Sequence, residues 1–463
     1  MTVAPAPGAA VVAPDGSLDH AGIRRAADQV AAGLDRAGVR SGAVVGLMLP
    51  NSLAFVPTYL ALRSLSVTVA LIPPKYGSAE LDAIRRGVRP AALVTTAAGA
   101  KTLATERVAR IDLDFAPEPL AVAFTGDGGT VPDAAVLKFT SGSTGQPKGI
   151  ALTASALEGE AGNIVTGLAL GPGDRILAPV PLCHSYGFDL GVLALLRVGC
   201  TLVQEDAFVP RRVLAELASG RVSVFLGVPA MYRAWLALPP ARSDAALPVR
   251  YLLSCTAPLP AAVVTAFHAR HHTPISQHYG SSETGAVTTH VPARVLERPD
   301  SVGRPMGDVA IRIAENGEIV VSSGALARGY VMGAPADRQP FQPDGYRTGD
   351  LGRIEDGFLY VQGRVDDLIN VGGFKVSPRE VVEVLESFPA VAEAAVVGVR
   401  DARGEEVVYA VVALAHPATE AEMLAHCRAR LAEYKVPRRV EIRSSLPRGP
   451  TGKVQLRAED VRV

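Results

Sequence analysis

The sequence has few cysteines, no excess of charge of either sign and no long apolar run. Its four cysteines, among 463 residues, include no Cys-x-x-Cys pair. This pattern argues against a disulfide framework or a zinc site and predicts small buried side chains in a reducing compartment. Lys and Arg total 46, as do Asp and Glu, so the charge gives no reason to expect nucleic acid or an anionic membrane as a partner. The cysteines are Cys183, Cys200, Cys255 and Cys427.

Targeting and membrane signals are also missing. Residues 1–14 lack a positively charged region and are interrupted by prolines, so we expect a frayed start rather than a signal peptide. The longest apolar stretch, residues 190–203, contains Arg197 and is too short to span a bilayer. We therefore expect a cytoplasmic protein without a membrane partner. We also expect a monomer or a homodimer.

Strand-like apolar runs alternate with helical patterns up to about residue 290. Residues 17–40 have helical spacing, and residues 43–50 follow as a strand. The runs 222–229 and 249–255 are continuously apolar, as expected for strands covered on both faces. The alternation predicts parallel α/β layers. The apolar face of the first helix comprises Ile23, Ala27, Val30 and Leu34.

The pattern changes after residue 300. A hairpin is predicted around Asn316-Gly317, because Asn-Gly favours a two-residue turn. From Val365 onward the sequence predicts a compact α+β unit with helices at 377–388 and 419–433. The likeliest domain boundary is the charged turn around residues 363–367.

Residues 137–150 read L-K-F-T-S-G-S-T-G-Q-P-K-G-I, a glycine- and hydroxyl-rich block after a strand-like run. It is not a Walker loop, because Pro147 stands where that motif requires its second glycine. Glycines let backbone amides approach an anion, hydroxyls donate hydrogen bonds, and Lys148 adds a positive charge. The alternative is a flexible surface loop, but the ordered string favours a phosphate site. Its residues are Thr140, Ser141, Gly142, Ser143, Thr144, Gly145 and Lys148.

This block resembles the signature loop of the adenylate-forming superfamily, which includes acyl- and aryl-CoA synthetases, peptide-synthetase adenylation domains and luciferase. Other motifs of the superfamily are matched in order along nearly the whole chain. They are P-L-C-H-S-Y-G (181–187), Y-G-S-S-E-T (279–284), Y-R-T-G-D (346–350), G-R-V-D-D-L-I-N-V-G-G-F-K-V-S-P-R-E-V-V-E (363–383) and P-R-G-P-T-G-K-V (447–454).

The resemblance implies an α/β fold with a large N-terminal multi-sheet α/β domain and a small mobile C-terminal α+β domain. The adenylation domain would span residues 1–363, the hinge 364–367 and the lid domain 368–463. Asp366 matches the hinge residue, where a large change in backbone angles is absorbed. Gly372 and Gly373 would form the thiol loop, where missing side chains leave room for a pantetheine arm.

The resemblance also implies a two-step reaction. A carboxylate attacks the α-phosphate of ATP and pyrophosphate leaves; a thiol then attacks the acyl-adenylate and AMP leaves. The enzyme mainly positions and neutralises anions. Coenzyme A and the phosphopantetheine of an acyl carrier protein present the same thiol arm, so the sequence leaves both open as acceptors.

Four residues are implied to act at the reacting groups. Lys453 would lie between the substrate carboxylate and the α-phosphate, and Ser282 would donate to that phosphate. Glu283 would bind Mg²⁺ through a hard carboxylate oxygen. His184 would gate the passage between the nucleotide and acid sites. The plainer alternatives are a tail lysine, a surface carboxylate and a structural histidine.

A further set is implied to hold the nucleotide. Asp350 and Arg364 would contact the ribose, and Tyr279 would stack on adenine opposite a backbone strip. Cys255-Thr256 replaces a commoner Gly-Gly or Gly-Ala in that strip, so extra bulk is expected there. The strip consists of Thr256, Ala257 and Pro258, and the remaining nucleotide-site positions are Gly280, Ser281 and Lys375.

Tyr186, Asp189 and His278 are expected to line the acid pocket. His278 occupies a position where many related ligases have glycine, so it should narrow the tunnel. A buried Asp189 needs a donor, supplied either by an amino or hydroxyl group of the substrate or by a protein group such as His278. We expect an amino- or hydroxy-substituted aryl acid or a short polar acid rather than a long fatty acid.

Two other functions stay open at this point. The enzyme could adenylate a different oxyanion, such as nitrite for diazotisation of an aryl amine. A non-catalytic nucleotide-binding scaffold is disfavoured, because Glu283, Asp350, Arg364 and Lys453 are all present. The cluster H-A-R-H-H (268–272) is expected to be a solvated surface rather than a metal site.

Overall fold

The computed structural model describes most of the chain, and the chain divides into two compact units. The first unit comprises residues 1–311 and 321–346, and the second comprises 312–320 and 347–463. The predicted hinge and domain limits around residues 364–367 stay predictions. The described residues are 5–103, 105, 107–126, 128–141, 147–239, 245–333, 339–365, 367–371, 374–401, 405–448, 454 and 456–461.

A nine-stranded sheet forms one layer of the first unit. From β14 to β1 in the order given below, neighbouring strands pair in parallel, whereas β16, β15 and β2 pair antiparallel. The apolar runs predicted as covered parallel strands are confirmed as β12 and β13. The order is β16 (Arg304–Pro305), β15 (Gly285–Thr289), β14 (Ile275–Ser281), β13 (Tyr251–Ser254), β12 (Val224–Gly227), β10 (Arg175–Ala178), β11 (Thr201–Gln204), β1 (Ala10–Ala13) and β2 (Gly16–Leu18).

An eight-stranded sheet carries the glycine-rich block. Its inner strands β8, β4, β3 and β5 pair in parallel, and the strands at both edges pair antiparallel. The block begins at the end of β8 and ends at the start of β9, so the predicted strand before it is confirmed. The order is β19 (Gly329–Met332), β9 (Pro147–Leu152), β8 (Val136–Ser141), β4 (Thr68–Leu71), β3 (Val44–Met48), β5 (Ala92–Thr96), β7 (Leu120–Phe124) and β6 (Val108–Ile111).

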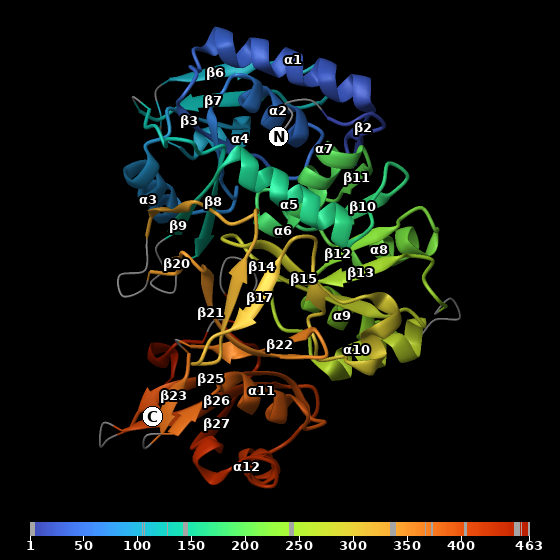
Figure 1. Cartoon of the computed structure of the whole chain (residues 1–463), viewed down its shortest axis with the longest axis vertical. Coiled ribbons are helices and arrows are strands. Elements are labelled where there is room, and N and C mark those ends of the chain that lie inside the picture. The colour runs from blue at the N-terminus through green and yellow to red at the C-terminus, as the bar shows by residue number, and fades with distance from the viewer. Residues whose placement is uncertain are drawn as a thin grey trace. The chain divides into compact units, whose positions relative to one another are not determined.

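Helices cover these sheets, and the predicted apolar face of the first helix is buried. In α1 (His20–Ala37), the Asp19 side chain accepts a hydrogen bond from the Gly22 amide and Gly38 ends the helix at a φ of 100°. This helix packs on α2 and beside β6 (Figure 1). The other helices of this unit are α2 (Phe55–Ser64), α3 (Ser78–Val88), α4 (Ala97–Lys101), α5 (Ala154–Gly167), α6 (Ser185–Gly187), the π-helical η1 (Phe188–Leu193), α7 (Ala194–Val198), α8 (Pro210–Ala218), α9 (Pro229–Leu236), α10 (Ala261–His271) and the 3₁₀ helix η2 (Pro292–Glu297).

The predicted hairpin around Asn316-Gly317 is confirmed: β17 (Ala310–Ile313) and β18 (Glu318–Ser322) flank the turn. They belong to a five-stranded sheet in the order β17-β18-β21-β20, with β22 paired to β21. The bounds of its other strands are β20 (Phe341–Gln342), β21 (Gly345–Glu355) and β22 (Phe358–Arg364).

The α+β pattern predicted for the C-terminal part is confirmed, with one helix shorter than expected. The helix expected at 419–433 ends at Arg428, where the amides of Arg430 and Leu431 both donate to the Cys427 carbonyl and tighten the chain. The elements are β23 (Ile369–Val371), β24 (Phe374–Val376), α11 (Pro378–Glu386), β25 (Val391–Arg400), β26 (Glu406–Leu414), α12 (Glu420–Arg428), η3 (Glu433–Lys435), β27 (Arg439–Arg443) and η4 (Ala458–Asp460).

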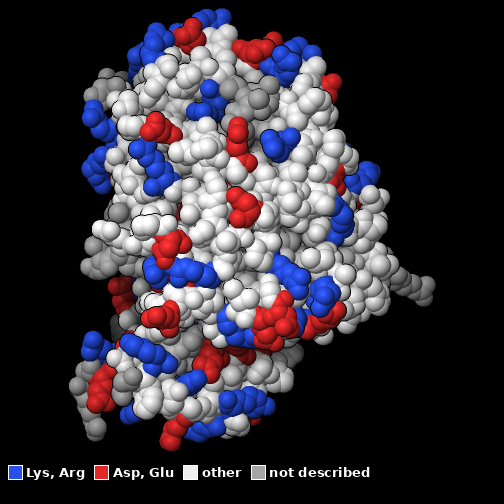
Figure 2. Space-filling view, in the orientation of Figure 1, with Lys and Arg blue, Asp and Glu red and all other residues white. Residues whose placement is uncertain are grey.

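All four cysteines are buried and outside any disulfide bond, as predicted. Burial raises the pKa of Cys183 and Cys200 to about 12 and that of Cys427 to about 11. Among the described residues, the helices are too short or too polar to cross a membrane. Figure 2 shows Lys and Arg interspersed with Asp and Glu over the face in view, so that face presents no extended field of one sign.

Candidate active site

The glycine-rich block lies between two antiparallel strands of the first unit. Thr140 on β8 pairs with Lys148 on β9 in the strand register. This pairing places a hydroxyl side chain and a cationic side chain opposite each other at the base of the block. Four predicted phosphate-site residues, Gly142, Ser143, Thr144 and Gly145, lie outside the described residues, as does the side chain of Ser141.

The His184 motif meets the Y-G-S-S-E-T motif. His184 precedes α6, and the hydroxyl of the next residue, Ser185, lies 2.6 Å from the hydroxyl of Ser282. The two segments are 97 residues apart in sequence. The structure therefore brings the segment that contains the predicted gate histidine into contact with the predicted phosphate-donor serine.

A network of short-range hydrogen bonds shapes the turn after β14. The Ser281 hydroxyl accepts from the backbone amides of Glu283 and Thr284, each at 3.2 Å. The Ser281 amide donates in return to the Thr284 hydroxyl at 3.1 Å. Short polar side chains commonly stabilise turns in this way, so the direction of the Glu283 backbone is fixed locally.

The Glu283 carboxylate is oriented by a tyrosine that sequence reasoning missed. Tyr330 on β19 donates its hydroxyl to Glu283 Oε1 at 2.8 Å, and its oxygen lies 3.0 Å from the hydroxyl of Tyr346. The Ala327 amide donates to the Glu283 carbonyl at 2.8 Å. Metal-ligating carboxylates are typically held by such outer hydrogen bonds, so this half-buried carboxylate fits the donor chemistry of Mg²⁺.

The predicted adenine strip has a strained backbone. Thr256 follows β13 with a φ of +75°, a conformation that β-branched residues rarely adopt, and its side chain is exposed. Glycine would adopt this φ freely, so the departure noted in the sequence has a structural consequence at this residue. Ala257 and Pro258 are also exposed, and Tyr279 lies half-buried on β14.

The predicted ribose contacts belong to the second unit and face each other. Asp350 on β21 pairs with Arg364 on β22, and Arg364 Nε lies 3.6 Å from Asp350 Oδ1. Before Asp350, the Gly349 amide donates to the buried carboxylate of Glu318 at 2.8 Å. Gly349 has a φ of +79°, which favours glycine there. Glu318 is a second supporting residue that the motif did not reveal.

Tyr186 and His278 form an aromatic pair in the first unit. Their rings stack at 6.0 Å with an interplanar angle of 27°, and both are buried. Burial lowers the pKa of His278 to about 4, and its Nδ1 lies 2.7 Å from the Thr289 hydroxyl. The buried Tyr186 hydroxyl has no hydrogen-bond partner among the described residues. A polar group of a bound molecule would satisfy it.

Asp189 has a donor within the protein, so it does not need one from the substrate, and its place in the acid pocket stays a prediction. Its two carboxylate oxygens each lie 2.7 Å from Nζ of Lys138, and both side chains are buried. The protein-group alternative is the correct one, but the partner is Lys138 rather than His278. An amine on the substrate is no longer required to neutralise Asp189.

The remaining predicted positions divide into described and undescribed residues. Lys375 lies exposed on β24, and Gly280 lies half-buried on β14. In the histidine cluster, His271 is buried against Phe267 at 4.6 Å between ring centroids, so the expectation of a solvated surface is wrong for that residue. Lys453, Asp366, Gly372 and Gly373 lie outside the described residues.

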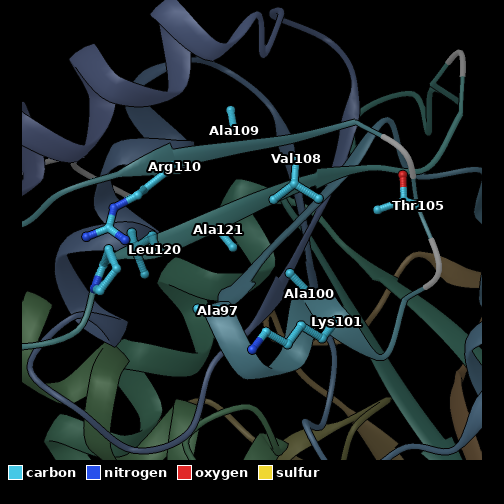
Figure 3. Close-up of a pocket in the computed structure, with 10 residues that line it drawn as sticks. Ala97, Ala100, Lys101, Thr105, Val108, Ala109, Arg110, Leu120 and Ala121 are labelled. Carbon is cyan, nitrogen blue, oxygen red and sulfur yellow. The ribbon is translucent and has the colours of Figure 1, made fainter.

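A pocket of about 390 Å³ lies away from these residues. It is bordered by α4, β6 and β7, with Lys101 and Val108 among its lining side chains (Figure 3). No predicted site residue lines it. In the strand order of its sheet, β6 and β7 lie at the opposite end from β9, so we assign this pocket no part in the site.

Comparison with known protein families identifies the family of this chain. Residues 3–331 match the model of the AMP-binding enzyme family, and residues 380–453 match that of the AMP-binding enzyme C-terminal domain. The chain belongs to the AMP-binding enzymes. It is an adenylate-forming acid–thiol ligase, which converts an acid to its adenylate and then to a thioester.

Several relatives of this AMP-binding enzyme are similar over most of its length. A feruloyl-CoA synthase of Amycolatopsis sp is 33% identical over 95% of this chain and 92% of its own. A long-chain-fatty-acid–CoA ligase of Mycobacterium tuberculosis is 30% identical over the same shares. The solved structure of the o-succinylbenzoate CoA synthetase of Bacillus subtilis with its acyl-adenylate has a TM-score of 0.82 and 26% identity, covering 97% of this chain and 94% of that one. An anthranilate CoA ligase with anthranoyl-AMP has a TM-score of 0.82 and 26% identity, covering 96% and 92%.

Proposed function

We propose that this enzyme activates a small aryl or short polar acid with ATP and transfers the acyl group to coenzyme A. The observation that carries the proposal is the 2.6 Å contact between Ser185 and Ser282. It brings together the segments to which the family assigns the acid gate and the phosphate donor. When two substrates are held side by side in this way, much of the entropic cost of bringing them together is met before the reaction begins.

The roles proposed for the residues that would hold ATP rest on the same family resemblance. Asp350 and Arg364 would hold the ribose, Tyr279 would stack on adenine, and Lys453 would neutralise charge between carboxylate and α-phosphate. Glu283, already oriented by Tyr330, would hold Mg²⁺. The metal neutralises phosphate oxygens when bound. Asp366, Gly372 and Gly373 stay proposals for the hinge and the thiol loop, and Lys375 for a contact near the nucleotide.

The acid class is argued from Tyr186 and His278. Two stacked aromatic rings suit a planar acid, and the unsatisfied Tyr186 hydroxyl suits a polar substituent on it. His278 fills space where the family commonly has glycine, which disfavours a long acyl chain. Feruloyl-CoA synthase and the anthranilate ligase, both similar to this chain, have names that denote substituted aryl acids.

Coenzyme A is the proposed acceptor because the similar curated ligases named above are CoA enzymes. An acyl carrier protein presents the same thiol arm and is an outcome of the test. Nothing in the comparisons favours nitrite activation or a non-catalytic scaffold, and the structure adds no observation for either.

The test is pyrophosphate release from ATP and Mg²⁺ with a panel of acids: ferulate, anthranilate, sulfoacetate and palmitate. We expect release with an aryl or short polar acid, thioester formation with coenzyme A, and loss of both in Lys453→Ala. Release with palmitate alone would contradict the proposed acid class. Thioester formation only with a carrier protein would contradict the proposed acceptor.

Tyr186→Phe tests the acid contact. Removing this hydroxyl should raise KM for a hydrogen-bonding acid about tenfold, equivalent to about 1.4 kcal/mol, without changing KM for ATP. Tyr59→Phe is the matched control, because the Tyr59 hydroxyl is also buried without a partner among the described residues. Equal effects of the two substitutions on KM for the acid would contradict a role for Tyr186 in binding.

A further inference from the structure

A buried ion pair links the nucleotide segment to the acid segment of the first unit. Lys138 is 1% exposed and Asp189 is 3% exposed, and Lys138 Nζ lies 2.7 Å from each carboxylate oxygen of Asp189. Lys138 lies on β8, two residues before Thr140. Asp189 lies on η1, three residues after Tyr186. The pair therefore connects the strand that leads into the glycine-rich block with the helix that follows the acid-pocket tyrosine.

A second buried acidic group, that of Glu160, links this ion pair to the turn that carries Glu283. Glu160 on α5 is fully buried, and its two oxygens accept from the Ala286 amide at 2.8 and 3.0 Å. A Cβ at Gly285 would lie 1.9 Å from Glu160 Oε2, and Gly285 has a φ of +70°. Only glycine fits between this carboxylate and the turn. The helix that carries Glu160, α5, packs against η1, which carries Asp189, and against β15, which carries Ala286. The charges of Asp189 and Lys138 also act on Glu160, so we treat the three side chains as one cluster.

Stability alone does not account for this cluster. Withdrawing charged groups from water costs several kcal/mol per ion, and an apolar pair of similar volume is often equally stable or more stable. What a buried pair supplies beyond apolar contact is direction, because its two hydrogen bonds hold only in one register. Asp189 also lies in a π-helical turn, a local irregularity that is frequent at functional sites.

We propose that Lys138, Asp189 and Glu160 form a buried positioning unit that fixes the nucleotide segments against the acid segment, so that occupation of one site orders the other. The inference rests on the proposed function, because it takes the segments at Thr140 and Glu283 to hold ATP and the segment at Tyr186 to hold the acid. None of the three side chains is required to touch a substrate. Each acts through the backbone of a neighbouring segment.

Hydrogen–deuterium exchange of the wild-type chain with Mg²⁺ and α,β-methylene-ATP tests this unit. We expect the analogue to slow exchange at residues 188–193, which include no predicted nucleotide contact. The double variant Lys138→Met/Asp189→Leu should still bind the analogue but lose that protection. With an acid from the panel above, it should also lose about tenfold or more in kcat/KM for the acid, with an unfolding midpoint close to that of the wild type.

The outcomes distinguish a positioning role of the three side chains from a role in core packing alone. Unchanged exchange at residues 188–193 in the wild type with the analogue bound, or equal protection in a folded double variant, would overturn the inference. If the double variant does not fold, Lys138→Arg decides: it keeps the charge but changes the geometry, and it should weaken the protection. Full protection and full activity in Lys138→Arg would overturn the inference. Failure of the analogue to bind at all would overturn the proposed function, and the inference with it, whereas binding without protection overturns the inference alone.

Discussion

Asp350 and Arg364 stand opposite each other on β21 and β22, with their side chains 3.6 Å apart and the aspartate 21% exposed. A carboxylate beside a guanidinium suits two adjacent hydroxyls, which donate to the carboxylate and accept from the guanidinium. Asp350 lies only four residues after Tyr346, whose hydroxyl contacts that of Tyr330 beside Glu283. The Y-R-T-G-D motif thus contains the carboxylate proposed for the ribose and a tyrosine whose hydroxyl contacts that of Tyr330.

Asp350→Asn should weaken ATP binding. Losing hydrogen bonds to a charged group removes about 1.5–3 kcal/mol, so KM for ATP should rise about tenfold to a hundredfold with little change in KM for the acid. Glu355→Gln is the control, because Glu355 lies on the same strand in an exposed pair with Arg353. A KM for ATP that is equal in the two variants would rule out ribose recognition by Asp350.

Thr256→Gly should stabilise the protein. A residue held at an unfavourable φ stores about 1–3 kcal/mol, and glycine relieves this at an entropic cost of about 0.5–1 kcal/mol. The free energy of unfolding, measured in urea, should therefore rise by about 1 kcal/mol. Thr256→Ala is the control, since it removes the hydroxyl and methyl groups but keeps the Cβ. An equal gain in Thr256→Ala would show that the side chain, and not the backbone, is the source.

Glu160 should make the protein less stable as the pH rises. Burial, reinforced by the charge of Asp189 and by Asp308, raises its pKa to about 8, while Lys138 and the Ala286 amide act in the opposite direction. Because the folded pKa exceeds the unfolded value of 4.5, its contribution to stability is complete below about pH 4.5 and is lost as the pH rises through about 8. Glu160→Gln should lose less stability than the wild type between pH 5 and 8.5 in urea titrations. Parallel curves would contradict this assignment.

His278 should act at the acid end of the range. Burial lowers its pKa from 6.5 to about 4, so the folded state keeps the ring neutral while the unfolded state binds a proton. Its contribution to stability is present above about pH 6.5 and is lost as the pH falls towards 4. Thermal unfolding of His278→Asn should be less sensitive to pH between 6.5 and 4 than that of the wild type. A larger loss in the variant would place the sensitive group elsewhere.

Local patterns predicted the elements, because helical spacing and turn chemistry act over a few residues. Residues 17–40 gave α1 nearly at its observed limits, and Asn316-Gly317 lies at the turn between β17 and β18. The fold class followed from the order of motifs, and the comparisons support it. The helix predicted at 419–433 was too long, because its pattern does not show that the carbonyl of Cys427 receives two amides.

The supporting residues of the site could not be predicted, because their partners are distant in sequence. Lys138 and Asp189 are 51 residues apart, and Tyr330 and Glu283 are 47 apart. A signal was present for the first pair: a lysine inside an apolar strand and an aspartate inside an apolar helix each need a buried counter-charge. One sequence showed that each needed a partner, but not that they were partners of each other.

The cysteines described above provide a natural probe of how the two units unfold. A buried thiol with a raised pKa reacts poorly with alkylating reagents, because the thiolate is the nucleophile. Of the thiols with a raised pKa, Cys183 and Cys200 belong to the first unit and Cys427 to the second. Mass spectrometry of alkylated peptides along a denaturant series would therefore report separately on the opening of each unit, without any amino-acid substitution.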